Sequence, residues 1–195
     1  NTFVTLFQSY GPDEALAMTI TFNWDIIALM PLWGLNLGIM SMVGRYMGAG
    51  KVDLALRATW SGVRVAAALT LCTAFAFLFF TEPLIEVFLP DLPEDTLAGI
   101  MALATNMLRL VSFYCLATAV NMVFTATLRA SGDTQWCLLI SIAANWSMLG
   151  LTFMSIRVWN WSPESTWLVF VGTVVLEALM FYMRFLSGKW KACLL

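Results

Sequence analysis

Nineteen consecutive uncharged residues, IIALMPLWGLNLGIMSMVG (Ile26–Gly44), decide the fold class of this chain. A bilayer has a hydrocarbon core about 30 Å thick, which a helix of ~20 apolar residues can cross. Three further uncharged runs have 17, 19 and 23 residues, and a fifth run contains one acidic residue. These four runs are Val65–Thr81, Leu110–Leu128, Thr134–Ile156 and Ser165–Met183. The pattern predicts five membrane-spanning helices.

The composition of the whole chain supports the same fold class. Of its 195 residues, 61% are hydrophobic and 11% are charged, whereas soluble domains have roughly 45–50% and 25%. A soluble fold of this size has too little interior to bury so much apolar surface. We therefore predict an all-α polytopic transmembrane helix bundle, one domain over residues 1–195, integral to the plasma (inner) membrane and surrounded by the lipid bilayer.

Several classes of function are excluded by residue types that the chain lacks. It contains no histidine, so it has no His-ligated metal site and no Ser-His or Cys-His nucleophilic centre. Its four cysteines form no CxxC motif, and its net charge of −2 gives no basic field for nucleic acid. We predict that the protein is not an enzyme, needs no cofactor and does not bind nucleic acid.

Extending the apolar runs to the nearest turn residues sets the limits of the predicted helices. They lie near 13–46, 52–81, 94–130, 133–157 and 164–187. Residues 1–10 precede the helix-breaking pair Gly11-Pro12 and have the composition of the last turns of an earlier span. Because the first residue is Asn1 and not methionine, we expect the chain to begin within a longer protein.

The loops between these helices alternate in charge. Basic residues follow the first, third and fifth helices, namely Arg45, Lys51, Arg57, Arg129, Arg184, Lys189 and Lys191. The intervening loops are mainly acidic, with Asp13, Glu14, Glu82, Glu86, Asp91, Glu94, Asp95 and Glu164. Basic loops remain on the cytoplasmic side of a membrane. We therefore expect the C-terminus in the cytoplasm.

Four ionisable residues lie inside predicted spans, where such groups are costly and mark functional sites. Asp25 and Arg109 are predicted at one depth, approached from outside, and Arg64 and Glu177 at another, approached from the cytoplasm. Matched depth suggests the pairs Asp25–Arg109 and Arg64–Glu177. Arg64 has an alternative, which is to extend its long side chain to the interface. Glu177 and Arg109 have the alternative of purely structural ion pairing.

Asp25 is the strongest functional candidate, because its side chain is too short to reach water from that depth. A carboxylate held there can exchange a proton or a sodium ion as solvent access changes. Asn23 precedes it on the same span, and Tyr114, Thr118 and Asn121 share one helix face on the third. These polar residues would line an ion-coupling and substrate path, although hydrogen bonding between helices is the alternative explanation.

The first span also contains a set of helix-perturbing residues. Pro31 removes one backbone hydrogen bond and should bend the helix. Gly34 and Gly38 follow at the GxxxG spacing, which is typical of close helix packing. A hinge beside a cavity is an alternative interpretation that is compatible with the first.

Four motifs in order resemble the multidrug and toxic compound extrusion (MATE) transporters. The longest is ITFNWDIIALMPLWGLNLGIMSMVGRYMGAGKVDLALRA (Ile20–Ala58), which is similar to the eighth span and following loop of that family. NMLRL (Asn106–Leu110) resembles its tenth span, LRASGDT (Leu128–Thr134) its LRGxGDT turn, and RFLSGKWK (Arg184–Lys191) its basic tail. The resemblance covers nearly the whole chain, from the end of span seven to span twelve.

The resemblance implies a twelve-helix transporter built of two six-helix halves, of which this chain matches the second. It implies export of organic cations or amphipathic small molecules in exchange for sodium or protons by alternating access. Tyr114 matches a tyrosine that lies near the coupling-ion site in some members. Where some members carry an acidic residue four positions later, this chain has Thr118. We infer that Asp25 supplies part of that charge.

We therefore predict a cation-coupled exporter with Asp25 as the coupling group, and the missing N-terminal half of the same chain as its partner. The alternative is a lipid-linked oligosaccharide flippase of related fold. A flippase needs a strongly cationic cavity for pyrophosphate, and only Arg64 and Arg109 are candidates here. That alternative therefore ranks lower.

Overall fold

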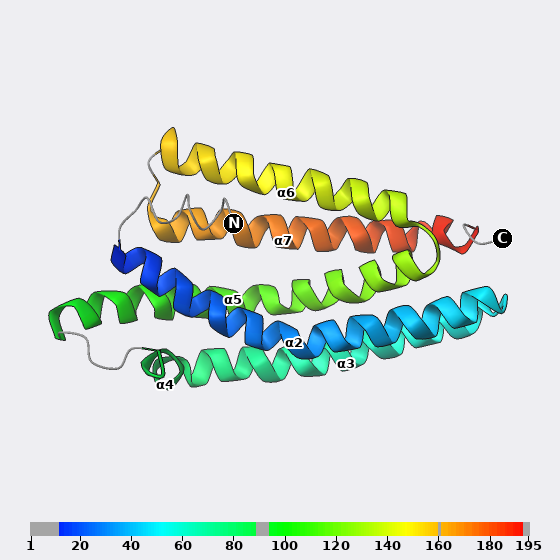
Figure 1. Ribbon diagram of the computed structural model, residues 1–195, viewed down its shortest axis with the longest axis horizontal. Coiled ribbons are helices and arrows are strands. Elements are labelled where there is room, and N and C mark those ends of the chain that lie inside the picture. Colours follow the sequence, from blue (N-terminus) through cyan, green and yellow to red (C-terminus); the bar gives the residue numbers. More distant parts are fainter. Residues whose placement is uncertain (1–11, 89–93, 160, 193–195) are drawn as a thin grey trace.

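The computed structural model describes residues 12–88, 94–159 and 161–192 as an all-α bundle. Five long helices, α2 (Pro12–Gly48), α3 (Val52–Phe79), α5 (Glu94–Ala130), α6 (Thr134–Arg157) and α7 (Pro163–Leu186), lie roughly side by side (Figure 1). Short helices α4 (Thr81–Glu86) and η1 (Lys189–Ala192) follow α3 and α7. The predicted all-α fold class is confirmed.

All five long helices are long and apolar enough to cross a membrane, and the chain is an integral membrane protein. Their bounds differ by at most two residues from the predicted ranges. The predicted partial span over residues 1–10 lies outside the described residues. At 1.5 Å per residue the 37 residues of α2 and of α5 each extend about 55 Å. Both helices therefore exceed the bilayer thickness and must tilt or protrude.

Helix α5 is the centre of the bundle. It packs against α2 and α3 on one side and against α7 on the other, while α6 packs mainly on α7 (Figure 1). The buried apolar side chains form two clusters. One surrounds Met107 and Trp167 near the α4 end, and the other surrounds Phe124 and Phe181 at the opposite end. We call the latter end, where the α2–α3 turn and η1 lie, the basic end.

Glycines allow the chain to reverse at the basic end. Gly50 in the α2–α3 turn and Gly132 in the α5–α6 turn have φ angles of 68° and 88°, a region that favours glycine. A third glycine brings α2 and α3 together. A β-carbon on Gly62 of α3 would lie 2.4 Å from Cδ1 of Ile39, so the Ile39 side chain would have to shift to admit any larger residue.

The predicted packing glycines of α2 have a different environment. Gly34 and Gly38 are exposed, and a β-carbon at either position would meet no atom within 4 Å. Neither glycine therefore packs against another helix of the described residues, and close packing at the GxxxG spacing stays a prediction. Helix α2 is nevertheless bent near its middle (Figure 1), and Pro31 lies near the middle of its range.

Candidate functional site

Asp25 lies on α2 with only 7% of its surface exposed. It faces α5, where its neighbours include Tyr114 and Cys115. Beside its carboxyl group is a small cavity of about 10 Å³, bounded by α2, α3 and α5. The cavity is lined by Asp25, Ala28, Leu29, Leu32, Thr70, Thr73, Cys115 and Thr118. A space of this size holds about one water molecule, and hence one small ion. We call it the Asp25 cavity.

Three threonine hydroxyl groups lie on the walls of the Asp25 cavity. Each donates its hydrogen to a backbone carbonyl one turn earlier on its own helix: Thr70 to Ala66 at 2.9 Å, Thr73 to Leu69 at 3.1 Å and Thr118 to Tyr114 at 3.2 Å. A hydroxyl that has donated its hydrogen can still accept through its lone pairs. The Asp25 cavity therefore offers a carboxylate and hydroxyl acceptors, an arrangement suited to a cation.

The hydroxyl group of Tyr114 is an exception to the usual pairing of buried polar atoms. Tyr114 is 2% exposed, and its hydroxyl lies close enough to interact with the Asp25 carboxyl group. The two groups do not reach hydrogen-bonding geometry, however, so this buried hydroxyl is unsatisfied. An unsatisfied buried hydroxyl costs stability. Such a group can be satisfied when the carboxyl group moves or when an ion or water enters the cavity.

Helix α4 holds the α4 end of α2 in place near Asp25. The indole nitrogen of Trp24 donates a hydrogen bond of 2.8 Å to the carbonyl of Leu84, and its ring meets Phe88 edge to face. Ile85, between them, is fully buried. The residue before Asp25 is therefore anchored to the segment after α3, which fixes the position of the carboxylate along the bundle axis.

The structure brings together some of the predicted site residues and separates others. Tyr114 and Thr118 lie with Asp25, but Asn23 is half-buried and does not line the Asp25 cavity. Asn121 also lies elsewhere: it is near Glu177 of α7, and its side-chain oxygen accepts a hydrogen bond of 3.1 Å from Thr125. Thr118 and Asn121 share a broad helix face, yet α2 covers one edge of that face and α7 the other.

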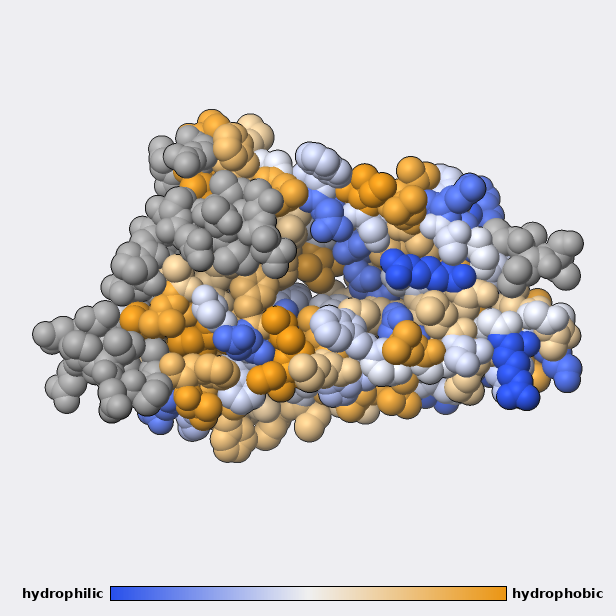
Figure 2. Space-filling model, viewed as in Figure 1, coloured by the Kyte–Doolittle hydropathy of each residue, from blue (hydrophilic) through white to orange (hydrophobic). Residues whose placement is uncertain are grey.

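Glu177 is a second carboxylate within a span, and unlike Asp25 it is only half-buried. It accepts a hydrogen bond of 3.3 Å from the hydroxyl of Ser141 on α6, and Asn121 of α5 lies near it. The cation near it is Arg129 at the end of α5. Figure 2 shows hydrophilic side chains along the crevice between the α6–α7 pair and α2.

The two predicted charge pairs are not formed within the described part of the chain. Arg64 is exposed on α3, whereas Glu177 faces α5 and α6. Arg109 is exposed on α5, whereas Asp25 is buried. The members of each pair were predicted at the same depth, but they do not meet, because their side chains point in different directions around their helices. Arg109 lies five residues before Tyr114, which is about 140° around a helix with 3.6 residues per turn.

A different ion pair joins two helices at the basic end. The Nε and Nη2 atoms of Arg184 donate hydrogen bonds of 2.7 and 3.1 Å to the two carboxylate oxygens of Asp133. The guanidinium also lies 4.6 Å from the ring centre of Trp136. Asp133 belongs to the LRASGDT segment quoted above, so this motif supplies a structural contact between the start of α6 and the end of α7.

Three side chains of the Asp25 cavity that carry an oxygen or a sulfur atom, Thr70, Thr73 and Cys115, were not predicted from the sequence. Thr70 and Thr73 are three residues apart within an uncharged span, a spacing that places them on one helix face. That signal could have found them. Cys115 carried no signal, because a single buried cysteine in an apolar run is usually a small hydrophobic residue. Among the described residues, no group of three or more His, Cys, Asp or Glu side chains could hold a metal ion.

The fold and the site define a class of protein: a polytopic helical membrane protein that holds a buried carboxylate beside an ion-sized cavity inside a span. Comparison with known proteins then identifies the family. The profile of the MatE family matches residues 1–154. The chain therefore belongs to the MATE family, as its motifs predicted.

Several bacterial proteins are similar to nearly the whole chain. A probable multidrug resistance protein NorM of Thermotoga maritima is 23% identical over 190 residues, covering 97% of this chain and 40% of that protein. The multidrug resistance protein MdtK of Pectobacterium atrosepticum is 28% identical over 215 residues, covering 93% and 46%. A probable NorM of a Synechococcus strain is 28% identical over 189 residues, covering 95% and 40%. The chain thus spans less than half the length of these relatives.

Proposed function

We propose that this chain forms the C-terminal half of a secondary active exporter, and that Asp25 is its ion-coupling group. Its cargo would be organic cations or amphipathic small molecules, exchanged for sodium ions or protons. The observation that carries the proposal is the Asp25 cavity, where a buried carboxylate faces acceptor oxygens with space for one small ion. The relatives named as multidrug resistance proteins support the class of cargo.

The coupling step follows from the electrostatics of a charge inside a membrane. A carboxylate at depth is costly in the absence of a counter-ion. Binding of sodium or a proton at Asp25 neutralises it, with the hydroxyls of Thr70, Thr73 and Thr118 available as additional oxygen ligands for sodium. The transporter then shifts between its outward-open and inward-open states by the difference in affinity of each state for that ion.

Helix α2 transmits this change. Asp25 lies on α2 six residues before Pro31, and a proline removes a backbone hydrogen bond that would otherwise resist bending. Neutralising Asp25 would release its interaction with α5 and allow the two parts of α2 to change their mutual angle. Gly34 and Gly38, exposed just beyond Pro31, leave space for another helix to approach that bend.

The orientation in the membrane is part of the proposal. The basic end would lie in the cytoplasm, so the C-terminus after η1 would be cytoplasmic and the α4 end would face the outside. The membrane would be the plasma (inner) membrane. The lower-ranked alternative, a lipid-linked oligosaccharide flippase, has no support at the Asp25 cavity, since neither Arg64 nor Arg109 lines it.

The experiment is efflux of a cationic dye by the full-length transporter in vesicles with an imposed sodium or proton gradient. Asp25→Asn should abolish gradient-driven efflux, because an amide is neutral in both states and cannot exchange a cation. Asp53→Asn, which alters an exposed carboxylate near the start of α3, is the matched control and should keep efflux. Undiminished efflux by Asp25→Asn would remove Asp25 from the coupling mechanism. Comparing the two gradients identifies the coupling ion.

A further inference from the structure

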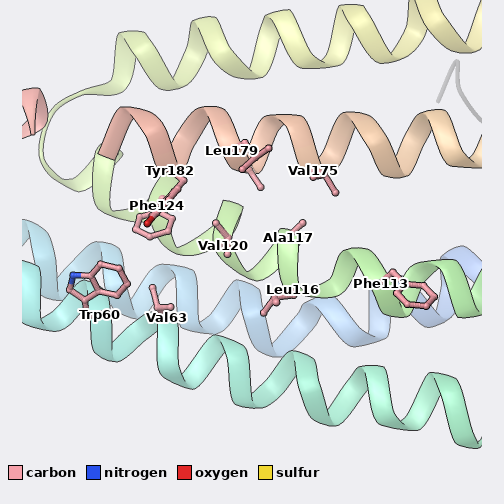
Figure 3. A pocket seen from close by; sticks show the side chains of 11 residues that line it. Trp60, Val63, Phe113, Leu116, Ala117, Val120, Phe124, Val175, Leu179 and Tyr182 are labelled. Atoms are coloured by element: carbon pink, nitrogen blue, oxygen red, sulfur yellow. The ribbon is translucent and has the colours of Figure 1, made fainter. Parts of the chain in front are cut away.

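A long apolar groove lies on the side of α5 that the Asp25 cavity does not use. It has a volume of about 460 Å³ and is bounded by α3, α5 and α7 (Figure 3). Trp60, Phe124 and Tyr182 lie at its basic end, and Leu116, Ala117 and Phe113 follow along α5. We call it the α3–α7 groove. Every residue that lines it is apolar or aromatic.

The length of the α3–α7 groove matches one leaflet of a bilayer. Phe113 and Phe124 are eleven residues apart on α5, which is about 16 Å along a helix. Half of a hydrocarbon core about 30 Å thick is about 15 Å. Phe113, at the far end, is 73% exposed. A groove of this length that starts at the basic end is suited to one acyl chain of the leaflet on that side.

The rim of the groove at the basic end resembles the surroundings of a lipid headgroup. The ring of Trp60 meets Phe124 and Phe185 edge to face, at 6.2 and 6.3 Å between centroids. Tyr182 lies against Phe124 at 5.3 Å. Tryptophan and tyrosine are enriched at the membrane interface, where an apolar ring meets polar headgroups. The aromatic residues therefore mark the depth at which a headgroup would lie.

Positive charge lies on the same side of α3 as Trp60. Arg57 is three residues before Trp60 and Arg64 is four after it, a spacing that places all three on one helix face. Both arginines are exposed, and neither forms an ion pair with a described residue. Side chains on a helix tilt toward its N-terminus. The N-terminus of α3 is at the basic end, so the Arg64 side chain is directed toward the headgroup region.

We propose that the α3–α7 groove is a binding site for an anionic phospholipid of the leaflet at the basic end. One acyl chain would occupy the groove, and Arg64, with Arg57, would bind the phosphate. The commitment to an anionic lipid rests on charge complementarity. An arginine within a span requires an anion or an aqueous path, and a lipid phosphate beside Trp60 supplies the anion. This site also explains why Arg64 does not pair with Glu177.

The groove is separate from the proposed transport path. No residue lines both the groove and the Asp25 cavity. The hydrophilic crevice opens on the face seen in Figures 1 and 2, where α2 lies in front of α3, whereas in Figure 3 α3 lies in front of α2. A lipid in the groove would therefore be a bound component of the transporter and not its cargo. Its binding does not depend on the role proposed for Asp25.

The test is lipid retention by the purified full-length transporter, measured by native mass spectrometry. The probes are phosphatidylglycerol and phosphatidylethanolamine with identical acyl chains. We expect preferential retention of phosphatidylglycerol, and a loss of about tenfold or more in Arg64→Gln, since it removes a charge-assisted hydrogen bond. Arg45→Gln, an exposed arginine on α2, is the matched control and should retain the lipid. Equal losses in both variants, or no preference for phosphatidylglycerol, would overturn the proposal.

Variants that fill the groove test where the acyl chain lies. Ala117→Trp should reduce retention of both lipids, whereas Leu138→Trp, on an exposed position of α6, should not. Leu116→Trp fills the groove from an exposed position and serves if Ala117→Trp does not fold. Unchanged retention in a folded groove variant would show that the groove is not occupied by lipid, for instance because the rest of the transporter covers it. Asp25→Asn should retain phosphatidylglycerol, which separates this test from that of the coupling site.

Discussion

The Asp25 cavity and the α3–α7 groove lie on different sides of the same helix, and they differ in almost every physical property. The cavity has about 10 Å³, a buried carboxylate and three hydroxyl oxygens, whereas the groove has about 460 Å³ and an apolar lining. Tyr114 and Phe113 are neighbours in sequence, yet one is buried beside Asp25 and the other is exposed in the groove. One turn of α5 thus serves two chemically unrelated environments.

This difference shows how a single transmembrane helix can be polar where it faces an ion and apolar where it faces lipid. A polar group facing hydrocarbon is costly, so the hydroxyls of α5 near Asp25 lie on the side covered by α2 and α3. The side chains on the groove side require no partner, and their exposure to lipid carries no penalty. If the two regions have separate roles, then substitutions in one should leave the other unchanged.

The largest effect is expected where α2 and α3 meet at Gly62 and Ile39, because a large side chain there would push apart the two helices that carry Asp25, Thr70 and Thr73. Gly62→Leu would place its side chain on Ile39, where even a β-carbon lies at 2.4 Å. Overpacking of this kind costs about 1–3 kcal/mol or more. We expect a clear fall in thermal stability and loss of ion-driven efflux. Ile39→Ala should partly restore both in the double variant, and a failure to do so would place the strain elsewhere.

The next effect concerns the oxygen ligands of the Asp25 cavity. Thr70→Val and Thr73→Val keep the shape of the side chain and remove its hydroxyl. Loss of one ligand oxygen should weaken coupling-ion binding by about tenfold, corresponding to roughly 1.4 kcal/mol. Sodium dependence of efflux measures this change, and phosphatidylglycerol retention should be unaffected. Thr59→Val, on the same helix but bonded to Thr127 away from the cavity, is the control.

A smaller effect is expected for Tyr114→Phe, for which the direction of the change in stability is informative. The hydroxyl of Tyr114 is buried and unsatisfied, so its removal should leave thermal stability unchanged or raise it by up to about 1 kcal/mol. Ion-driven efflux should nevertheless fall if the hydroxyl assists ion binding at Asp25. A loss of stability with unchanged efflux would instead assign Tyr114 a structural role only.

The smallest effect is expected at the rim of the groove. Trp60→Leu removes two edge-to-face ring contacts, with Phe124 and Phe185, each worth about 0.5–1.5 kcal/mol. A modest fall in unfolding temperature should accompany weaker lipid retention, while the ion dependence of efflux remains as in the unaltered protein. A change in ion dependence would show that the two regions are coupled through α5.

The part of this structure that follows from hydropathy was predictable from the sequence. The uncharged runs located the five spans, because a span must be long and apolar whatever it packs against. Extending the runs to the nearest turn residues gave the helix limits within two residues. The same counting gave Asp25, Arg64, Arg109 and Glu177 positions within the spans, and the long helices contain all four. Their direction around each helix did not follow from it, since that direction depends on which helices are neighbours. The two predicted ion pairs failed for this reason.

The candidate site was predictable to the extent that its members lay close in sequence or matched the family. Tyr114 and Thr118 are one turn apart, and the resemblance placed Tyr114 near an ion site. Thr70 and Thr73 come from another helix, and only the packing of α3 against α2 and α5 brings them to Asp25. Gly34 and Gly38 have the well-known GxxxG spacing, but neither packs against another described helix. The isolated Gly62 is the glycine that packs closely against a neighbouring helix, at Ile39 of α2.

The ion pair between Asp133 and Arg184 has a consequence for movement. Asp133 is 4% exposed and Arg184 13%, so the pair is largely shielded from water and is not easily opened. It fastens the first turn of α6 to the last turn of α7, and α6 otherwise touches α5 very little. Helices α6 and α7 should therefore shift together as a rigid hairpin during any rearrangement of this lobe. Relative movement would then occur at the interface between α7 and α5, beside the α3–α7 groove.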